Sequence, residues 1–451
     1  MNSLDTQSIG EIIRKIRKER GLRLEDLADE SISPATISNL ERGVPHVKTD
    51  KLYYLLEKLD VSIDEVPEFL LSEKKEQEEL MFRLTAAESL RRLGKTESAL
   101  KALKELDISD DHSYASAYHW LIGTCYLDKR DLSKAERSFT TAIRLASRNQ
   151  AATQDNMEAY SFSDLGRCSY YRNDLQLALQ YTNSGLDAFC HDGERSYIKY
   201  ILLRNKAIYL ERLGRPAEAL KIVQDAWDEL GNVDHIEHTE TVLSFYWIRA
   251  EMLRKIGSLD EAIRYAQEGI QKASLNNLYA SGFDLWVTLG SAYTAKKEWE
   301  NAEASFNVAM EIAEETGKVI DNRFIRACVQ RAELYSNQKK WAEAENTLVQ
   351  AISKAKDRKC YAYLTDALLA LGNLHFANDR KNEAIEQYAE ARKAAKKHRF
   401  TEKEYQAWYG LANCYREIDE IEFRQCTENM YTLQRELNDQ KEARDQRETV
   451  L

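Results

Sequence analysis

The sequence has little proline and little glycine. Only 4 prolines and 17 glycines occur among its 451 residues, whereas an average protein has about 5% proline and about 7% glycine. This scarcity excludes a collagen-like or linker-rich chain, and it argues against an all-β sandwich or barrel, in which turn residues recur about every 8–12 positions. Three prolines, Pro34, Pro45 and Pro67, lie near the N-terminus, and only Pro216 follows them. We therefore expect a largely helical protein whose character changes near residue 70.

The sequence also lacks long apolar runs and closely spaced cysteines. The apolar runs are only a few residues long, so we expect no transmembrane helix and no membrane partner. The N-terminal residues lack the apolar core of a signal peptide. The 7 cysteines are scattered without a metal-ligand spacing, which indicates reduced thiols in a cytoplasmic protein and predicts no metal and no cofactor. No nucleotide-binding loop, HExxH or GxSxG motif occurs, so we expect no enzyme.

What the sequence does contain is an internal repeat. Pairs of small residues lie twelve positions apart, and the copies begin 36 to 43 residues apart. An aromatic residue or leucine follows the first small residue by three positions in most copies, and a bulky residue follows the second by four. The pairs are Ala87 with Ala99, Gly123 with Ala135, Gly166 with Ala178, Ala207 with Ala219, Ala250 with Ala262, Gly290 with Ala302, Ala332 with Ala344, and Gly372 with Ala384.

This pattern predicts two antiparallel helices in each copy, with the small residues where helices cross closely. It resembles the tetratricopeptide repeat, with longer helices or connections than the family's usual repeat. We expect an all-α protein in which residues 81–440 form about nine such repeats, stacked as a right-handed superhelix. A polar tail would follow at 441–451. The concave groove of such a stack suits an extended peptide or a partner helix.

The first 70 residues have a different pattern. A helical stripe of isoleucines ends at Gly21, Leu24 to Asp29 form a short second helix, and Ser33 with Pro34 begin a third that runs to about Arg42. Two short helices joined by a tight turn are typical of a helix-turn-helix. Further helices are expected at 48–59 and 63–71, so residues 1–70 would be a DNA-binding head and residues 71–80 a linker helix.

The third helix carries the most specific motif of the head. TISNLERG at residues 36–43 resembles the end of the common pattern of the Cro/phage-repressor (Xre-type) helix-turn-helix family. Two features depart from that family: Leu24 replaces a glutamine that often contacts DNA, and the turn is one residue shorter than the commonest form. The resemblance implies that the third helix enters the major groove, with Ile37 and Leu40 facing inward.

The DNA-contacting residues predicted from this resemblance fall into two groups. Those expected at or near base edges are Pro34, Ala35, Thr36, Ser38 and Asn39, with Arg42 and Lys48 as further candidates. A basic cluster on and after the first helix is either a phosphate-contacting surface or a solvated helix face; it comprises Arg14, Lys15, Arg17, Lys18, Arg20 and Arg23.

The charge of the chain limits how a single head can bind. The whole molecule has a net charge of −11, which argues against nonspecific nucleic-acid binding. Residues 1–60 contain ten Lys/Arg and eleven Asp/Glu, so one head should bind weakly. We expect a homodimer or higher oligomer that places two heads on two half-sites of a double-stranded operator.

A helix-turn-helix head followed by about nine lengthened repeats is similar to the peptide-pheromone regulators of Gram-positive bacteria, the Rap, Rgg, NprR, PlcR and PrgX group, with a size closest to NprR. The resemblance implies a cytoplasmic quorum-sensing transcription regulator. A short secreted peptide would be re-imported and bind the groove, altering the superhelix or the dimer and so DNA binding.

The repeat frame predicts which side chains line the groove. Positions one and four residues after the first small residue, and three before it, should point inward. Asparagine suits an extended peptide because its amide offers a donor and an acceptor, and an arginine there could bind a peptide carboxylate. The predicted groove residues are Arg167, Tyr170, Arg204, Trp247, Glu251, Glu333, Asn373, Tyr409 and Asn413.

Two other functions remain open at this point. One is a Rap-like regulator that promotes dephosphorylation of a response regulator, for which Gln77 is a weak candidate glutamine. The other is a mobile-element repressor whose repeats bind a protein partner. The sequence does not distinguish activation from repression.

Overall fold

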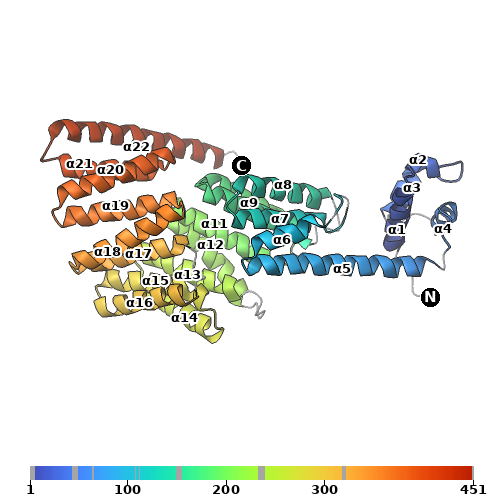
Figure 1. The fold of residues 1–451 in the computed structure, drawn as a ribbon, viewed down its shortest axis with the longest axis horizontal. Coiled ribbons are helices and arrows are strands. Elements are labelled where there is room, and N and C mark those ends of the chain that lie inside the picture. The colour runs from blue at the N-terminus through green and yellow to red at the C-terminus, as the bar shows by residue number, and fades with distance from the viewer. Residues whose placement is uncertain are drawn as a thin grey trace. The chain divides into compact units, whose positions relative to one another are not determined.

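A computed structural model describes residues 6–42, 49–62, 65–106, 108–110, 112–148, 155–231, 239–316 and 321–448 (Figure 1). The regular secondary structure within these ranges is helical, which confirms the predicted all-α class. No helix in them is both long and apolar enough to cross a membrane. Contacts divide the chain into two compact units, Met1–Tyr114 with Leu121–Asp131, and Ala115–Trp120 with Leu132–Leu451.

The helices follow one another along the whole of the described chain. In order they are α1 (Thr6–Glu19), α2 (Leu24–Leu27), α3 (Pro34–Glu41), α4 (Thr49–Lys58), α5 (Val66–Arg92), α6 (Thr96–Lys104), α7 (Ala115–Asp128), α8 (Leu132–Arg148), α9 (Met157–Tyr171), α10 (Leu175–Asp187), α11 (Ile198–Arg212), α12 (Pro216–Gly231), α13 (Thr239–Lys255), α14 (Leu259–Leu275), α15 (Tyr279–Lys296), α16 (Trp299–Thr316), α17 (Asp321–Asn337), α18 (Trp341–Asp357), α19 (Tyr361–Ala377), α20 (Lys381–Lys397), α21 (Thr401–Tyr415) and α22 (Glu420–Glu448).

The head folds around one apolar core. The isoleucine stripe of α1 packs against Leu27, Ile37 and Leu55 from the next three helices. The helix ends predicted from the sequence are confirmed at two residues. Gly21 has a left-handed φ of 66° after α1, and Ser33 Oγ accepts a 3.2 Å hydrogen bond from the Thr36 amide at the start of α3. Helix α2 ends at Leu27, two residues before its predicted end, because the following backbone is extended.

Helix α5 runs without a break from the head into the first repeat. Its first residue, Val66, is buried in the head core, and Leu84 and Ala87 are buried nearer its C-terminus, where α5 packs against α6. Residues 71–80, predicted as a separate linker helix, are thus the middle of one 27-residue helix. At the other end, the predicted polar tail from residue 441 is helical as far as Glu448.

The helices from α5 to α22 follow one another as nine successive pairs. The second small residue of each predicted pair, such as Ala302, is fully buried. At Gly290, the first small residue of its pair, a ring from the partner helix leaves no room for a side chain: an added Cβ would lie 2.9 Å from the ring of Phe306. Phe306 is the bulky residue four positions after Ala302, so the two halves of the repeat pattern describe one contact.

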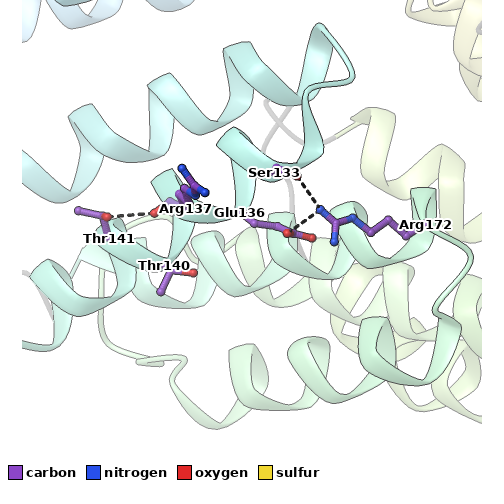
Figure 2. Close-up of a pocket in the computed structure, with 6 residues that line it drawn as sticks. All are labelled: Ser133, Glu136, Arg137, Thr140, Thr141 and Arg172. Atoms are coloured by element: carbon purple, nitrogen blue, oxygen red, sulfur yellow. Dashed lines mark hydrogen bonds and ion pairs between the residues drawn. The ribbon is translucent and has the colours of Figure 1, made fainter.

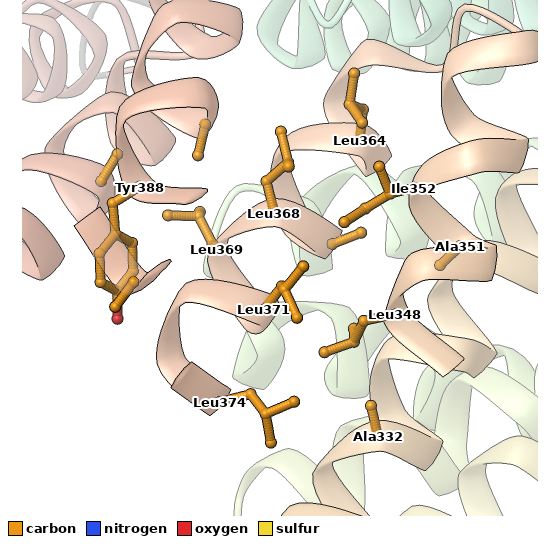
Figure 3. Close-up of a cluster of buried hydrophobic side chains, with 14 of the residues drawn as sticks. Ala332, Leu348, Ala351, Ile352, Leu364, Leu368, Leu369, Leu371, Leu374 and Tyr388 are labelled. Atoms are coloured by element: carbon orange, nitrogen blue, oxygen red, sulfur yellow. The ribbon is translucent and has the colours of Figure 1, made fainter. Parts of the chain in front are cut away.

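Side chains from neighbouring pairs merge into continuous cores. In the C-terminal part of the array, Leu348 of α18 lies among Leu368 and Leu371 of α19, and Tyr388 of α20 packs on the other side of α19 (Figure 3). Each pair on its own would leave one of these faces in water. These apolar faces are buried only when helix pairs stack on one another, which explains why the repeats occur as a long series.

The turns inside the pairs explain how so little glycine suffices. In eight pairs, a residue with left-handed φ lies one or two positions after the first helix and closes it. Glycine supplies only three of these; the eight are Gly94, Arg130, Asn173, Gly214, Gly257, Lys297, Lys339 and Asp379. A residue with a side chain costs roughly 1–2 kcal/mol in this conformation, and stacking of the array offsets that strain.

Candidate functional site

Helix α3 presents a polar outer face. Ile37 and Leu40 are buried, 0% and 3% exposed, as their predicted inward orientation requires. Pro34 and Ala35 are exposed, and the remaining candidate base-contacting residues of the helix are half-buried. The predicted recognition surface is therefore accessible, whereas Lys48 lies outside the described residues.

Asn39 is held in place by Arg42. The Arg42 Nη2 donates a 2.7 Å hydrogen bond to Asn39 Oδ1, and its Nε donates to the carbonyl oxygen of Ser38 at 3.1 Å. The Asn39 amide group retains its NH2 donors and a second lone pair on Oδ1. The guanidinium lies at the end of the same exposed face, where it adds positive charge.

Arg17 does not have the role predicted for it. Its guanidinium forms a bidentate ion pair with Glu41, at 2.6 and 2.9 Å, and donates to the carbonyl oxygen of Leu22 at 2.8 Å. Arg17 is only 9% exposed, and the hydrogen bond to Glu41 raises its pKa. Arg17 lies four residues after Ile13, so it continues the buried face of α1. The prediction of a basic surface cluster did not take this spacing into account. Arg17 joins α1 to α3 inside the head.

The rest of the basic cluster lies nearer the surface. Lys18, Arg20 and Arg23 are exposed and Arg14 is half-buried. Lys15 pairs with Glu76 of α5 at 2.6 Å. Exposed cations on and just after α1 are compatible with phosphate contacts, which position a protein on DNA without reading its sequence.

In the array, two of the predicted groove arginines lie next to a single buried carboxylate. Arg167 of α9 donates to Asp164 Oδ1 at 2.7 Å, and the Trp120 indole donates to Asp164 Oδ2 at 2.8 Å. Arg204 of α11 donates instead to the neutral amide oxygen of Asn205, Oδ1, at 3.1 Å. Burial and the neighbouring Arg167 lower the pKa of Arg204. This arrangement suits an additional anion.

Glu251 is an internal ion pair and not an open groove residue. It is 6% exposed, and it accepts hydrogen bonds from Arg254 at 2.8 and 2.9 Å and from Thr288 at 3.3 Å. Burial alone would raise the pKa of Glu251, but the hydrogen bond and charge of Arg254, with the charges of Arg326 and Lys255, lower it. Arg254 and Thr288 already engage the Glu251 carboxylate, so the structure gives it an internal role, and its predicted ligand contact stays untested.

Trp247 does present a donor. The Arg326 guanidinium lies 5.1 Å from the centre of its ring, within the range of a cation–π contact. The Trp247 Nε1 is buried without a hydrogen-bond partner. A buried unpaired donor is costly, and a ligand carbonyl oxygen would satisfy it.

The remaining predicted groove residues lie in the C-terminal helices. Glu333 and Asn373 are exposed, Tyr409 is 55% exposed, and Asn413 is half-buried. Asn373 accepts a 2.6 Å hydrogen bond from the Tyr388 hydroxyl. The structure places these residues on first helices of successive pairs, α17, α19 and α21, which pack in series.

Comparison with known proteins agrees with these two parts. The helix-turn-helix family matches residues 13–66, and the tetratricopeptide repeat family matches residues 84–152 and 369–420. The chain thus contains a helix-turn-helix segment and tetratricopeptide repeats. No protein of curated function matches its sequence.

Two solved structures share the fold of the tetratricopeptide array. A Rap protein in complex with competence and sporulation factor is 14% identical, with a TM-score of 0.56 over 80% of this chain and 99% of its own. A signal transduction ATPase with a tetratricopeptide repeat sensor, from Pyrococcus horikoshii, is 14% identical, with a TM-score of 0.51 over 97% of this chain and 65% of its own. At this identity, the likeness establishes the fold alone.

The sequence patterns missed two further residues on the first helices of repeat pairs, an aromatic one on α19 and a charged one on α17. Tyr363 and Arg326 lie nine and six positions before the small residues Gly372 and Ala332. The predicted frame used only positions from three before to four after. These helices are 15 to 18 residues long. Residues one or two turns before the frame therefore also lie on the helix face that the frame describes. Extending the frame by helical spacing would have found them.

A separate polar pocket lies beside α8 and α9 (Figure 2). It has a volume of about 510 Å³, and Arg172 crosses it to reach Ser133 at 3.3 Å and Glu136 at 2.8 Å. None of the predicted groove residues lines it. Among the described residues, no group of three or more His, Cys, Asp or Glu could hold a metal ion.

Proposed function

We propose that this chain is a cytoplasmic transcription regulator whose head binds an operator and whose repeat array binds a short signalling peptide, as in quorum sensing. The observation that carries the DNA part is the exposed polar face of α3, in which Asn39 is oriented by Arg42 while Ile37 and Leu40 are buried. An oriented amide is the group that pairs with adenine in the major groove.

The peptide part is supported by the donors of the array. Arg167 pairs with Asp164, Arg204 donates to the neutral amide of Asn205, and the Trp247 Nε1 is unpaired. An extended peptide carries carbonyl oxygens and a terminal carboxylate, so its chemistry matches these donors. The Rap protein of similar fold was solved with competence and sporulation factor, which agrees with a ligand-binding array.

The DNA proposal is tested by selecting operator sequences with the full-length protein and footprinting them. Asn39→Ala should weaken operator binding by about 10-fold or more, since a good bidentate base contact contributes about 1–3 kcal/mol. Asn429→Ala, a half-buried asparagine of α22 as Asn39 is of α3, is the matched control and should bind as the unchanged protein does. Equal footprints for both variants would contradict the placement of the recognition surface.

The peptide proposal is tested with a pool of short synthetic peptides. Peptides retained by the full-length protein are identified by mass spectrometry and titrated individually by calorimetry. Arg204→Gln should weaken binding of a retained peptide with a free C-terminal carboxylate, whereas Arg264→Gln, a half-exposed arginine of α14, should not. If no peptide is retained and a protein partner co-purifies instead, the array is a protein-binding module.

A further inference from the structure

Tyr170 and Tyr363 join the early and late parts of the array. Their hydroxyl oxygens lie 3.1 Å apart, although 193 residues separate them in the chain. Tyr170 is on α9 and Tyr363 on α19, the first helices of two pairs that are not neighbours. A contact over this separation means that the array curves until two distant first helices come within side-chain reach.

Arg212 strengthens the same contact from a third helix. Its Nη2, at the end of α11, donates to the Tyr363 hydroxyl oxygen at 3.1 Å, and its guanidinium lies 5.5 Å from the centre of the Tyr363 ring. The Tyr170 ring is in turn stacked on Tyr209 of α11, with ring centres 5.5 Å apart. Two early helices thus hold one late helix through the ends of long side chains.

The contact is built to be reversible. Tyr170, Tyr363 and Arg212 are all half-buried, so water can replace each hydrogen bond when it breaks. An ordinary hydrogen bond of this kind shifts a conformational equilibrium by roughly 10-fold or less. A ligand that binds the two arrangements with a modest difference in affinity can therefore reverse it.

The contact also leaves no room for a peptide between Tyr170 and Tyr363. Two groups in direct hydrogen-bond contact have no space between them for a polypeptide, whose backbone needs about 4.8 Å from a neighbouring strand. First helices line the concave side of a tetratricopeptide array. An extended ligand that runs along this side past α9 and α11 must separate the two tyrosines.

We propose that Tyr170, Tyr363 and Arg212 form a clasp that holds the ligand-free array in a closed curvature, and that a peptide in the groove opens it. Opening of the clasp by a peptide rests on the proposed peptide function. The existence of the clasp does not, because it is a property of the ligand-free protein. Opening changes the curvature of the array, which gives a bound peptide a means of altering distant parts of the chain.

The clasp is tested first in the ligand-free, full-length protein. Ruthenium-sensitised photo-oxidation joins tyrosines that lie in contact, and mass spectrometry should find a Tyr170–Tyr363 cross-link that is absent from Tyr363→Phe. The same variant should have a larger radius of gyration by small-angle X-ray scattering. Tyr361→Phe, a tyrosine on the same helix whose ring stacks on His398, should keep both the cross-link and the scattering profile. No cross-link, or unchanged scattering of a folded Tyr363→Phe, would overturn the clasp.

Peptide binding tests the second half. A retained peptide should bind Tyr363→Phe up to about 10-fold more tightly than the unchanged protein, because the variant no longer has to break the clasp. Weaker or equal binding would overturn competition between clasp and ligand. If no peptide binds either protein, the proposed peptide function fails while the cross-link and the scattering still decide the clasp.

Discussion

The hydroxyl of Tyr388 in α20 donates a 2.6 Å hydrogen bond to Oδ1 of Asn373 in α19. Tyr388 is 3% exposed and Asn373 is exposed, so a ring buried inside a helix pair reaches out to position a side chain on its surface. Burial raises the pKa of Tyr388, which keeps the phenol protonated as a donor. The Asn373 NH2 group is left free to face a ligand.

We expect Tyr388→Phe to weaken both the array and its ligand binding. The ring is retained, so stability should fall only by the net value of one hydrogen bond, about 0.5–1.5 kcal/mol, measured by urea unfolding. Peptide affinity should fall several-fold because Asn373 loses its fixed orientation. The double variant with Asn373→Ala should bind no more weakly than Asn373→Ala alone; an additive loss would show that Tyr388 acts independently of Asn373.

A methyl group should not fit at Gly410. A Cβ there would lie 2.5 Å from Cε1 of Tyr388, so Gly410→Ala must displace a ring already held by Asn373. We expect a loss of about 1–3 kcal/mol of unfolding free energy, typical of overpacking. The control is Gly282→Ala, where the nearest atom would be the Ala273 Cβ at 3.2 Å. Equal stability changes for the two variants would contradict the packing argument.

Breaking the Arg17–Glu41 pair should loosen the head. Both side chains are nearly buried, 11% and 5% exposed, and removing one partner of a buried pair costs about 3–5 kcal/mol. In Glu41→Gln, amides of α1 and α3 should exchange hydrogen faster, as measured by mass spectrometry on the full-length protein. The double variant Arg17→Met/Glu41→Leu should restore much of the protection, because no charge remains buried. Unchanged exchange in Glu41→Gln would show that the pair is not stabilising.

His375 should make the array sensitive to mild acid. It is 4% exposed, and burial, with the charge of Arg380, lowers its pKa. The unfolded chain therefore takes up a proton more readily than the folded one, so this stabilisation is fully present above the unfolded pKa of about 6.5 and is lost as pH falls below it toward the folded pKa. His375→Leu, which introduces the residue found at Leu210 and Leu253 of other repeats, should reduce the fall in melting temperature between neutral and mildly acid pH. An identical pH profile would exclude His375 as a cause.

Much of the fold follows from short-range patterns. The repeat spacing, twelve residues from Gly290 to Ala302 and four more to Phe306, reports the contact of Gly290 with Phe306 within one helix pair. A contact between residues close in the chain leaves a pattern in the sequence. The inward positions of Ile37 and Leu40 were predicted from the resemblance of residues 36–43 to the helix-turn-helix family, and both side chains are buried. Lys48 and the operator contacts remain predictions.

The parts that could not be predicted depend on partners distant in the chain. The repeat frame predicts Glu251 as a groove residue, but its carboxylate accepts a hydrogen bond from Thr288 of α15, the first helix of the next pair. The contact of Tyr170 with Tyr363 depends on the curvature that accumulates over several helix pairs. Small differences in the packing angle between neighbouring pairs cannot be predicted from the sequence of a single repeat. Arg17 could have been assigned from its spacing to Ile13, whereas its partner Glu41 required the fold of the head.

The unbroken helix α5 has a mechanical consequence. It is anchored at one end by Val66 in the head core and by the Lys15–Glu76 ion pair, and at the other by packing against α6. Its 27 residues make a rod about 40 Å long, so a tilt of about 10° at the α6 end would carry the other end through about 7 Å. Such a rod acts as a lever arm, and shifts of that size at the recognition helix are comparable to the width of a DNA groove.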